Sequence, residues 1–192
     1  SSPLQLAVMT ARIATGRAVR PRLFHKIDGI EQPSGAGESL GLNENHLIRV
    51  RQGMYDVSNT QGGTGFSARI VAEGMRMAGK SGTSQVRRIT PEERARGVTS
   101  NDQLPWERRD HALWVNYAPW DNPRYAVAVV IEHGGSGGSQ AGPIGRDITL
   151  QALYDGDPPL EAYPEGQRDT IREQQDRIRT RLSGTPASED RA

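Results

Sequence analysis

Residues 74–86 decide between two folds, and they read Gly-Met-Arg-Met-Ala-Gly-Lys-Ser-Gly-Thr-Ser-Gln-Val. The first eight match the phosphate-binding P-loop pattern G-x-x-x-x-G-K-[ST] letter for letter. A P-loop passes directly into a helix, whose N-terminal amides bind the phosphates. Here Gly82 and Thr83 come next, and a glycine followed by a β-branched residue favours an extended strand. We therefore expect Lys80-Ser81-Gly82-Thr83 to begin a strand, and a P-loop nucleotide-binding protein is the alternative.

The clearest β-strand pattern lies downstream of this motif. Residues 111–119 and 124–132 alternate in polarity and are rich in β-forming residues, and residues 120–123 between them read Trp-Asp-Asn-Pro. That sequence is typical of a turn, so the two segments predict an antiparallel hairpin. P-loop folds need parallel strands joined by crossovers instead.

Three helices are expected beside these strands. Residues 3–16 start with a proline and end with a glycine, as helices often do. Residues 43–58 carry apolar side chains on one helical face, and residues 141–154 also read as a helix. Helices segregated from antiparallel strands indicate an α+β fold.

Two polar stretches interrupt this pattern. Residues 91–109 are charged and too long for a tight turn, which predicts a surface insertion. From residue 155 onward proline, glycine and charge predominate. We expect residues 155–192 to form a mobile polar tail, within which residues 168–182 could form a charged helix.

Composition limits the possible partners. The chain has 24 basic and 23 acidic residues, a balance that gives no reason to expect a nucleic-acid partner. It has no cysteine, which excludes disulfides and thiolate zinc sites. Its four histidines lack metal-ligand spacing, so neither a metal nor a cofactor is expected. No stretch approaches the ~20 apolar residues of a membrane span.

The Lys-Ser-Gly motif is also the third signature of the serine penicillin-recognising enzymes, beside S-x-x-K and S-x-N. Residues 78–86 closely resemble the corresponding strand of class B, elongation-specific penicillin-binding proteins, those of the penicillin-binding protein two type. Residues 3–7 resemble the helix that precedes this strand, and residues 110–119 and 125–135 resemble the strands that follow. The resemblance covers residues 3–154 in the family's order. It implies part of a penicillin-binding-protein and serine β-lactamase-like transpeptidase fold over residues 1–154.

The resemblance implies a serine-type peptidoglycan D,D-transpeptidase and assigns roles within the strand. The hydroxyl of Thr83, with Ser81 as helper, would bind the terminal carboxylate of a stem peptide that ends in D-Ala-D-Ala. Lys80 would be a catalytic residue that supplies positive charge beside that carboxylate and helps to set protonation across the site. Gly82 would let the backbone approach the ligand, and the backbone N–H of Ser84 would be one oxyanion donor.

The family's other two signatures are missing from these 192 residues. Neither S-x-x-K nor S-x-N occurs, and only Lys26 and Lys80 are lysines. In the family the nucleophilic serine, its lysine base and the middle motif precede the helix at residue 3. We therefore expect this chain to be inactive alone, and to expose apolar surface that makes it poorly stable or self-associating.

For the whole protein, the resemblance implies a cell-wall enzyme of the bacterial envelope, at the periplasmic face of the inner membrane. β-Lactams would acylate its serine, and its partners would be elongation-complex proteins that include a membrane glycosyltransferase. A second alternative is a non-catalytic, penicillin-sensing module of the same fold.

Overall fold

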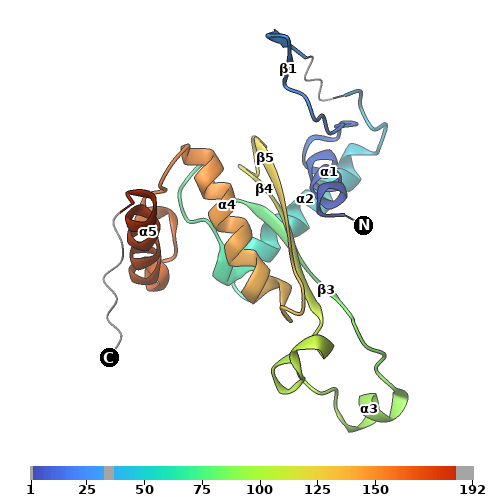
Figure 1. Cartoon of the computed structure of the whole chain (residues 1–192). Coiled ribbons are helices and arrows are strands. Elements are labelled where there is room, and N and C mark those ends of the chain that lie inside the picture. Colours follow the sequence, from blue (N-terminus) through green and yellow to red (C-terminus); the bar gives the residue numbers. More distant parts are fainter. Residues whose placement is uncertain (1, 33–36, 185–192) are drawn as a thin grey trace.

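The computed structural model describes residues 2–32 and 37–184. At its centre is a three-stranded antiparallel sheet with helices on both faces (Figure 1). Helices α1 (Pro3–Thr15) and α2 (Glu44–Asn59) cover one face, and α4 (Gly142–Tyr154) covers the other. This arrangement confirms the expected α+β fold.

The sheet has the order β3-β4-β5, with β3 at Ala78–Ser84, β4 at His111–Ala118 and β5 at Tyr125–Ile131. β4 and β5 form the predicted hairpin. β3 pairs antiparallel with β4, and Lys80 lies opposite Val115. The lysine and serine of the P-loop pattern therefore lie inside an antiparallel strand and not before a helix. The structure gives the nucleotide-binding alternative no support.

Local sequence explains where the helices begin and end. Ser2 accepts a hydrogen bond from the backbone of Gln5, whose side chain accepts one from the backbone of Ser2, and this capping box starts α1. Gly16 ends α1 in the left-handed conformation, with φ of 68°. The side chain of Asn43 accepts a hydrogen bond from the backbone N–H of Asn45 and starts α2.

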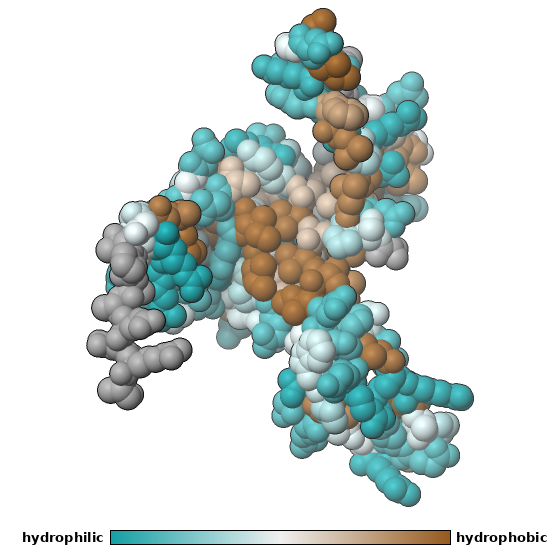
Figure 2. Space-filling model, in the orientation of Figure 1, coloured by the Kyte–Doolittle hydropathy of each residue, from teal (hydrophilic) through white to brown (hydrophobic). Residues whose placement is uncertain are grey.

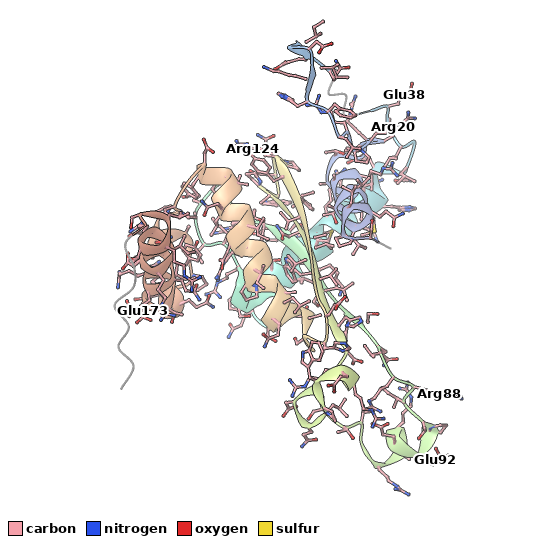
Figure 3. All side chains as sticks on the ribbon, in the orientation of Figure 1. Arg20, Glu38, Arg88, Glu92, Arg124 and Glu173 are labelled. Atoms are coloured by element: carbon pink, nitrogen blue, oxygen red, sulfur yellow. The ribbon has the colours of Figure 1, made fainter. Side chains whose placement is uncertain are left out.

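The remaining elements lie outside this central unit. β1 (Lys26–Ile27) and β2 (Ile30–Glu31) form a small hairpin on an arm, and α3 (Pro91–Arg96) lies in the predicted insertion, which projects from the sheet (Figure 1). Arg88 and Glu92 lie on this projection, away from the sheet (Figure 3). The short helical turns are η1 (Phe66–Ala68), η2 (Asn101–Gln103), η3 (Trp106–Arg108), η4 (Gly137–Ala141), η5 (Leu160–Ala162) and η6 (Glu165–Gln167).

The segment after residue 154 contains the charged helix expected at residues 168–182, but it packs against the core where the sequence predicts a mobile tail. Helix α5 spans Arg168–Leu182, and Ala162, Tyr163 and Ile171 are buried in the same apolar cluster as Leu150 of α4. The apolar face of this segment is thin, because among its described residues only these three are buried in that cluster, and so its packing against the core could not be predicted from the sequence. The boundary at residue 154 stays a prediction, and residues 185–192 lie outside the described residues.

A buried arginine helps to attach this segment to α4. Arg146 is almost fully buried, and its guanidinium lies 4.8 Å from the ring centre of Tyr163. It also donates hydrogen bonds to Asp147 and Gln167. Burial and the nearby Asp147 raise the pKa of Tyr163 to about 12. The phenol therefore stays neutral at physiological pH.

Apolar side chains also remain exposed around the sheet. They gather over α4 and β5 and along the arm (Figure 2), and include Ile144, Ile148, Val130, Leu23 and Phe24. Contiguous apolar surface of this kind is typical of contact sites.

Trp114 is the centre of the core beneath α4. Its side chain is fully buried, and its indole N–H donates a 2.9 Å hydrogen bond to the side chain of Asn116, which in turn donates one of 2.7 Å to Thr149. Glycines allow three other segments to approach the ring. A methyl group added at Gly65, Gly79 or Gly145 would overlap the indole ring. A methyl group added at Gly142 would be in van der Waals contact with it.

Two matched glycine substitutions test this packing. Gly145→Ala should destabilise the chain by about 1–3 kcal/mol, because the new methyl group would overlap Trp114 and lie within 2.9 Å of the Asn116 side-chain oxygen. Gly53→Ala should stabilise it by roughly 0.5–1 kcal/mol, because Gly53 is also helical but has nothing within 4 Å of its added Cβ. Urea unfolding followed by circular dichroism measures both. Stabilisation by both substitutions would contradict tight packing around Trp114.

Candidate functional site

β3 carries the predicted site residues and forms one edge of the sheet. Among the described residues only β4 pairs with it. Alternation along the strand puts Ser81 and Thr83 on one face, the face of Trp114, which lies opposite Ser81. The side chain of Lys80 leaves from the other face. The hydroxyls of Ser81 and Thr83 are therefore neighbours on one face of the strand.

Exposure changes along β3. Ala78 and Gly79 are buried, Ser81 and Gly82 are partly buried, and Lys80, Thr83 and Ser84 are exposed. The first half of the strand is therefore anchored in the core, and the second half, from Lys80 onward, reaches the surface.

The ammonium group of Lys80 returns to the strand backbone. Its Nζ donates a 2.6 Å hydrogen bond to the carbonyl oxygen of Ser81. The positive charge therefore lies at the backbone of the residue that carries one of the two hydroxyls. A carboxylate bound by these hydroxyls would gain from a nearby cation.

Sequence reasoning missed a third hydroxyl at this site. The Oγ1 atom of Thr64 lies 2.9 Å from Oγ of Ser81, and either atom can be the donor. Thr64 belongs to the glycine-rich turn after α2 and is separated from Ser81 by 17 positions. No sequence motif links residues at this separation. The one available signal is that Thr64 stands among the glycines of residues 62–65, which is typical of a constrained turn. Within the described residues the hydroxyl of Thr83 has no hydrogen-bond partner.

The turn η4 packs against both β3 and the turn that carries Thr64. Gly137 packs directly against the backbone of Gly82 and Leu113, and Gly138 packs against the carbonyl of Thr64. A side chain at either glycine would overlap that backbone. Both are buried, so η4 fixes β3 and the Thr64 turn relative to each other.

The exposed end of β3 is held by side chains beyond the motif. Ser84 pairs with His111, and the carboxylate of Asp110 accepts a 3.3 Å hydrogen bond from the backbone of Val86. The backbone N–H of His133 donates to Nδ1 of His111 at 2.9 Å. These contacts fix the position of Ser84, but its role as an oxyanion donor stays a prediction.

The described residues contain no group of three or more histidine and carboxylate side chains placed to bind a metal. None of the helices in residues 2–32 and 37–184 is long and apolar enough to cross a membrane.

Comparison with known proteins identifies the family. Residues 1–150 match the family model of the penicillin binding protein transpeptidase domain. Peptidoglycan D,D-transpeptidase MrdA of Haemophilus influenzae is 32% identical over 189 residues, which are 94% of this chain and 28% of that protein. MrdA of Acinetobacter baumannii is 37% identical over 149 residues, 73% of this chain and 21% of that protein. The chain thus spans about a quarter of the length of these relatives.

Solved structures agree with the sequence matches. The complex of penicillin-binding protein PBP2 and MreC from Helicobacter pylori superposes with a TM-score of 0.60 and 28% identity over 81% of this chain and 25% of that one. Pseudomonas aeruginosa PBP2 in complex with WCK 5153 gives 0.58 and 31% identity over 85% of this chain and 32% of that one. The chain therefore belongs to the penicillin-binding protein transpeptidase domain family, and its relatives are of the PBP2 type.

Proposed function

We propose that this chain supplies the substrate-binding strand of a peptidoglycan D,D-transpeptidase. The observation that carries the proposal is the arrangement of β3. Ser81 and Thr83 present two hydroxyls on one face of an edge strand, and the ammonium of Lys80 lies at the carbonyl of Ser81. Hydroxyl donors beside a fixed cation are suited to a carboxylate, because hydrogen bonds to an ionised acceptor are roughly twice as strong as neutral ones.

The proposed donor substrate is a stem peptide ending in D-Ala-D-Ala. Thr83 and Ser81 bind its terminal carboxylate, and the edge of β3 that β4 leaves free pairs with the extended peptide. Gly82 offers no side chain that would obstruct this pairing. The N–H of Ser84, at the exposed end of the strand, donates to the oxyanion that forms at the reacting carbonyl.

The reaction that this binding serves is acyl transfer in two steps. A serine from outside these 192 residues attacks the carbonyl of the penultimate D-Ala, and terminal D-Ala leaves as the amine with a proton. The amine of a second stem peptide then attacks the acyl-enzyme, which forms the cross-link and restores the serine. A β-lactam enters the first step because the serine opens its strained amide, while its carboxylate occupies the place of the terminal one.

The relatives' names and titles extend the proposal to partners. The relatives from H. influenzae and A. baumannii are named as transpeptidases, which favours an enzyme over a penicillin-sensing module. The H. pylori PBP2 was solved with MreC. We infer that the whole protein acts with elongation-complex proteins, including a membrane glycosyltransferase, at the periplasmic face of the inner membrane.

The first prediction separates this chain from the whole enzyme. A fluorescent penicillin should label a full-length protein that carries these residues and add one drug mass, because the serine is then present. The 192-residue chain alone should gain no mass. Intact-mass spectrometry measures both, and a stable adduct on the chain alone would contradict the assignment of the nucleophile to another segment.

The second prediction concerns Thr83. In the full-length protein, Thr83→Val should lower the second-order rate of acylation by penicillin roughly 10- to 150-fold, because a hydrogen bond to a charged group is lost. Thr83→Ser should keep most of the rate. Thr170→Val, at an exposed site on α5, is the matched control and should have no effect. An unchanged rate in Thr83→Val would contradict its role in carboxylate binding.

A further inference from the structure

We propose that Thr64 is a positioning residue that donates its hydroxyl proton to Ser81 and so directs the proton of Ser81 to the substrate carboxylate. The proposal rests on the function proposed above and adds a residue to the same site. Its starting observation is the 2.9 Å contact between Oγ1 of Thr64 and Oγ of Ser81.

Proton counting gives this contact a direction once ligand is bound. Each hydroxyl has one proton to donate and lone pairs to accept with. A carboxylate can only accept. If the Ser81 hydroxyl donated its proton to Thr64, only its lone pairs would face the substrate carboxylate, and they would repel it. The favourable order therefore runs from Thr64 to Ser81 to the carboxylate, and each hydrogen bond in such a chain polarises the next.

The backbone around Thr64 is fixed by neighbouring segments before any ligand arrives. Gly63 packs against the carbonyl of Val57 at the end of α2, and Gly65 donates a 3.0 Å hydrogen bond to the same carbonyl while it packs against Trp114. On the other side, Gly138 packs against the carbonyl of Thr64. A residue whose backbone is already fixed loses little conformational entropy when a ligand binds.

The surroundings of Thr64 also separate this role from a structural one. Its side chain is exposed, and within the described residues its hydroxyl bonds only to Ser81. The core contacts of the turn are made by the backbone and by the flanking glycines. Removing the Thr64 hydroxyl should therefore leave the fold intact and change only the direction in which the Ser81 hydroxyl donates its proton.

The test measures acylation of the full-length protein by penicillin, with initial binding and the acylation step resolved by stopped flow. Thr64→Val removes the hydroxyl and keeps the shape. It should weaken initial binding of penicillin by roughly 3- to 10-fold, the range of one neutral hydrogen bond. Thr64→Ser should restore binding to near the wild-type value. The melting temperature should be the same in all three proteins.

Two further measurements make the proposal specific to the carboxylate. In a Ser81→Ala background, Thr64→Val should not weaken penicillin binding further, because the Ser81 hydroxyl proton that Thr64 directs is already absent. With the methyl ester of penicillin as probe, Thr64→Val should weaken binding less than it does with penicillin, because a neutral ester accepts weaker hydrogen bonds than a carboxylate. Equal weakening with penicillin and its ester, or an undiminished effect in the Ser81→Ala background, would overturn the proposal.

The outcomes also distinguish this inference from the proposed function. If wild type is acylated and Thr64→Val binds penicillin as well as wild type does, the role of Thr64 is wrong and the transpeptidase assignment stands. If wild type is not acylated, the proposed function fails and the role of Thr64 fails with it. If Thr64→Val lowers the melting temperature, Thr64→Ala serves as the second variant, and loss of stability in both would make the residue structural.

Discussion

The close packing of glycines around Trp114 is the constraint on which the site depends. The indole is fully buried and is contacted by the turn before η1, by the start of β3 and by α4. Gly65 follows Thr64 and Gly79 precedes Lys80 in the chain. One ring therefore fixes, through neighbouring residues, the two segments whose hydroxyls meet at Ser81. The hydrogen bonds from Trp114 to Asn116 and from Asn116 to Thr149 orient the ring and satisfy polar groups in the core.

The site itself is polar and lies at the edge of this packed unit. β3 passes from full burial at Ala78 to exposure at Ser84, so a rigid strand presents exposed groups. The alternation of the strand separates the hydroxyls of Ser81 and Thr83 from the side chain of Lys80, whose ammonium nevertheless returns to the strand at the Ser81 carbonyl. Binding groups on a rigid element lose little entropy when a ligand arrives.

Local patterns in the sequence were sufficient for the central elements. Alternation and a turn sequence predicted the β4–β5 hairpin, and caps such as Gly16 predicted helix ends to within a residue or two. Residues 74–81 match the P-loop pattern, but the residues that follow them favour a strand where a P-loop requires a helix. Contacts between distant segments could not be predicted in this way. Thr64 meets Ser81 through the tertiary packing around Trp114, and the segment after residue 154 is attached by single residues such as Arg146 and Tyr163.

The most direct test of the central claim is a crystal structure of the full-length protein after reaction with penicillin. The carboxylate of the bound drug should accept hydrogen bonds from the hydroxyls of Thr83 and Ser81, and the drug should lie along the edge of β3 that β4 leaves free. A carboxylate bound elsewhere, with both hydroxyls more than 3.5 Å away, would contradict the assignment of β3 as the substrate-binding strand.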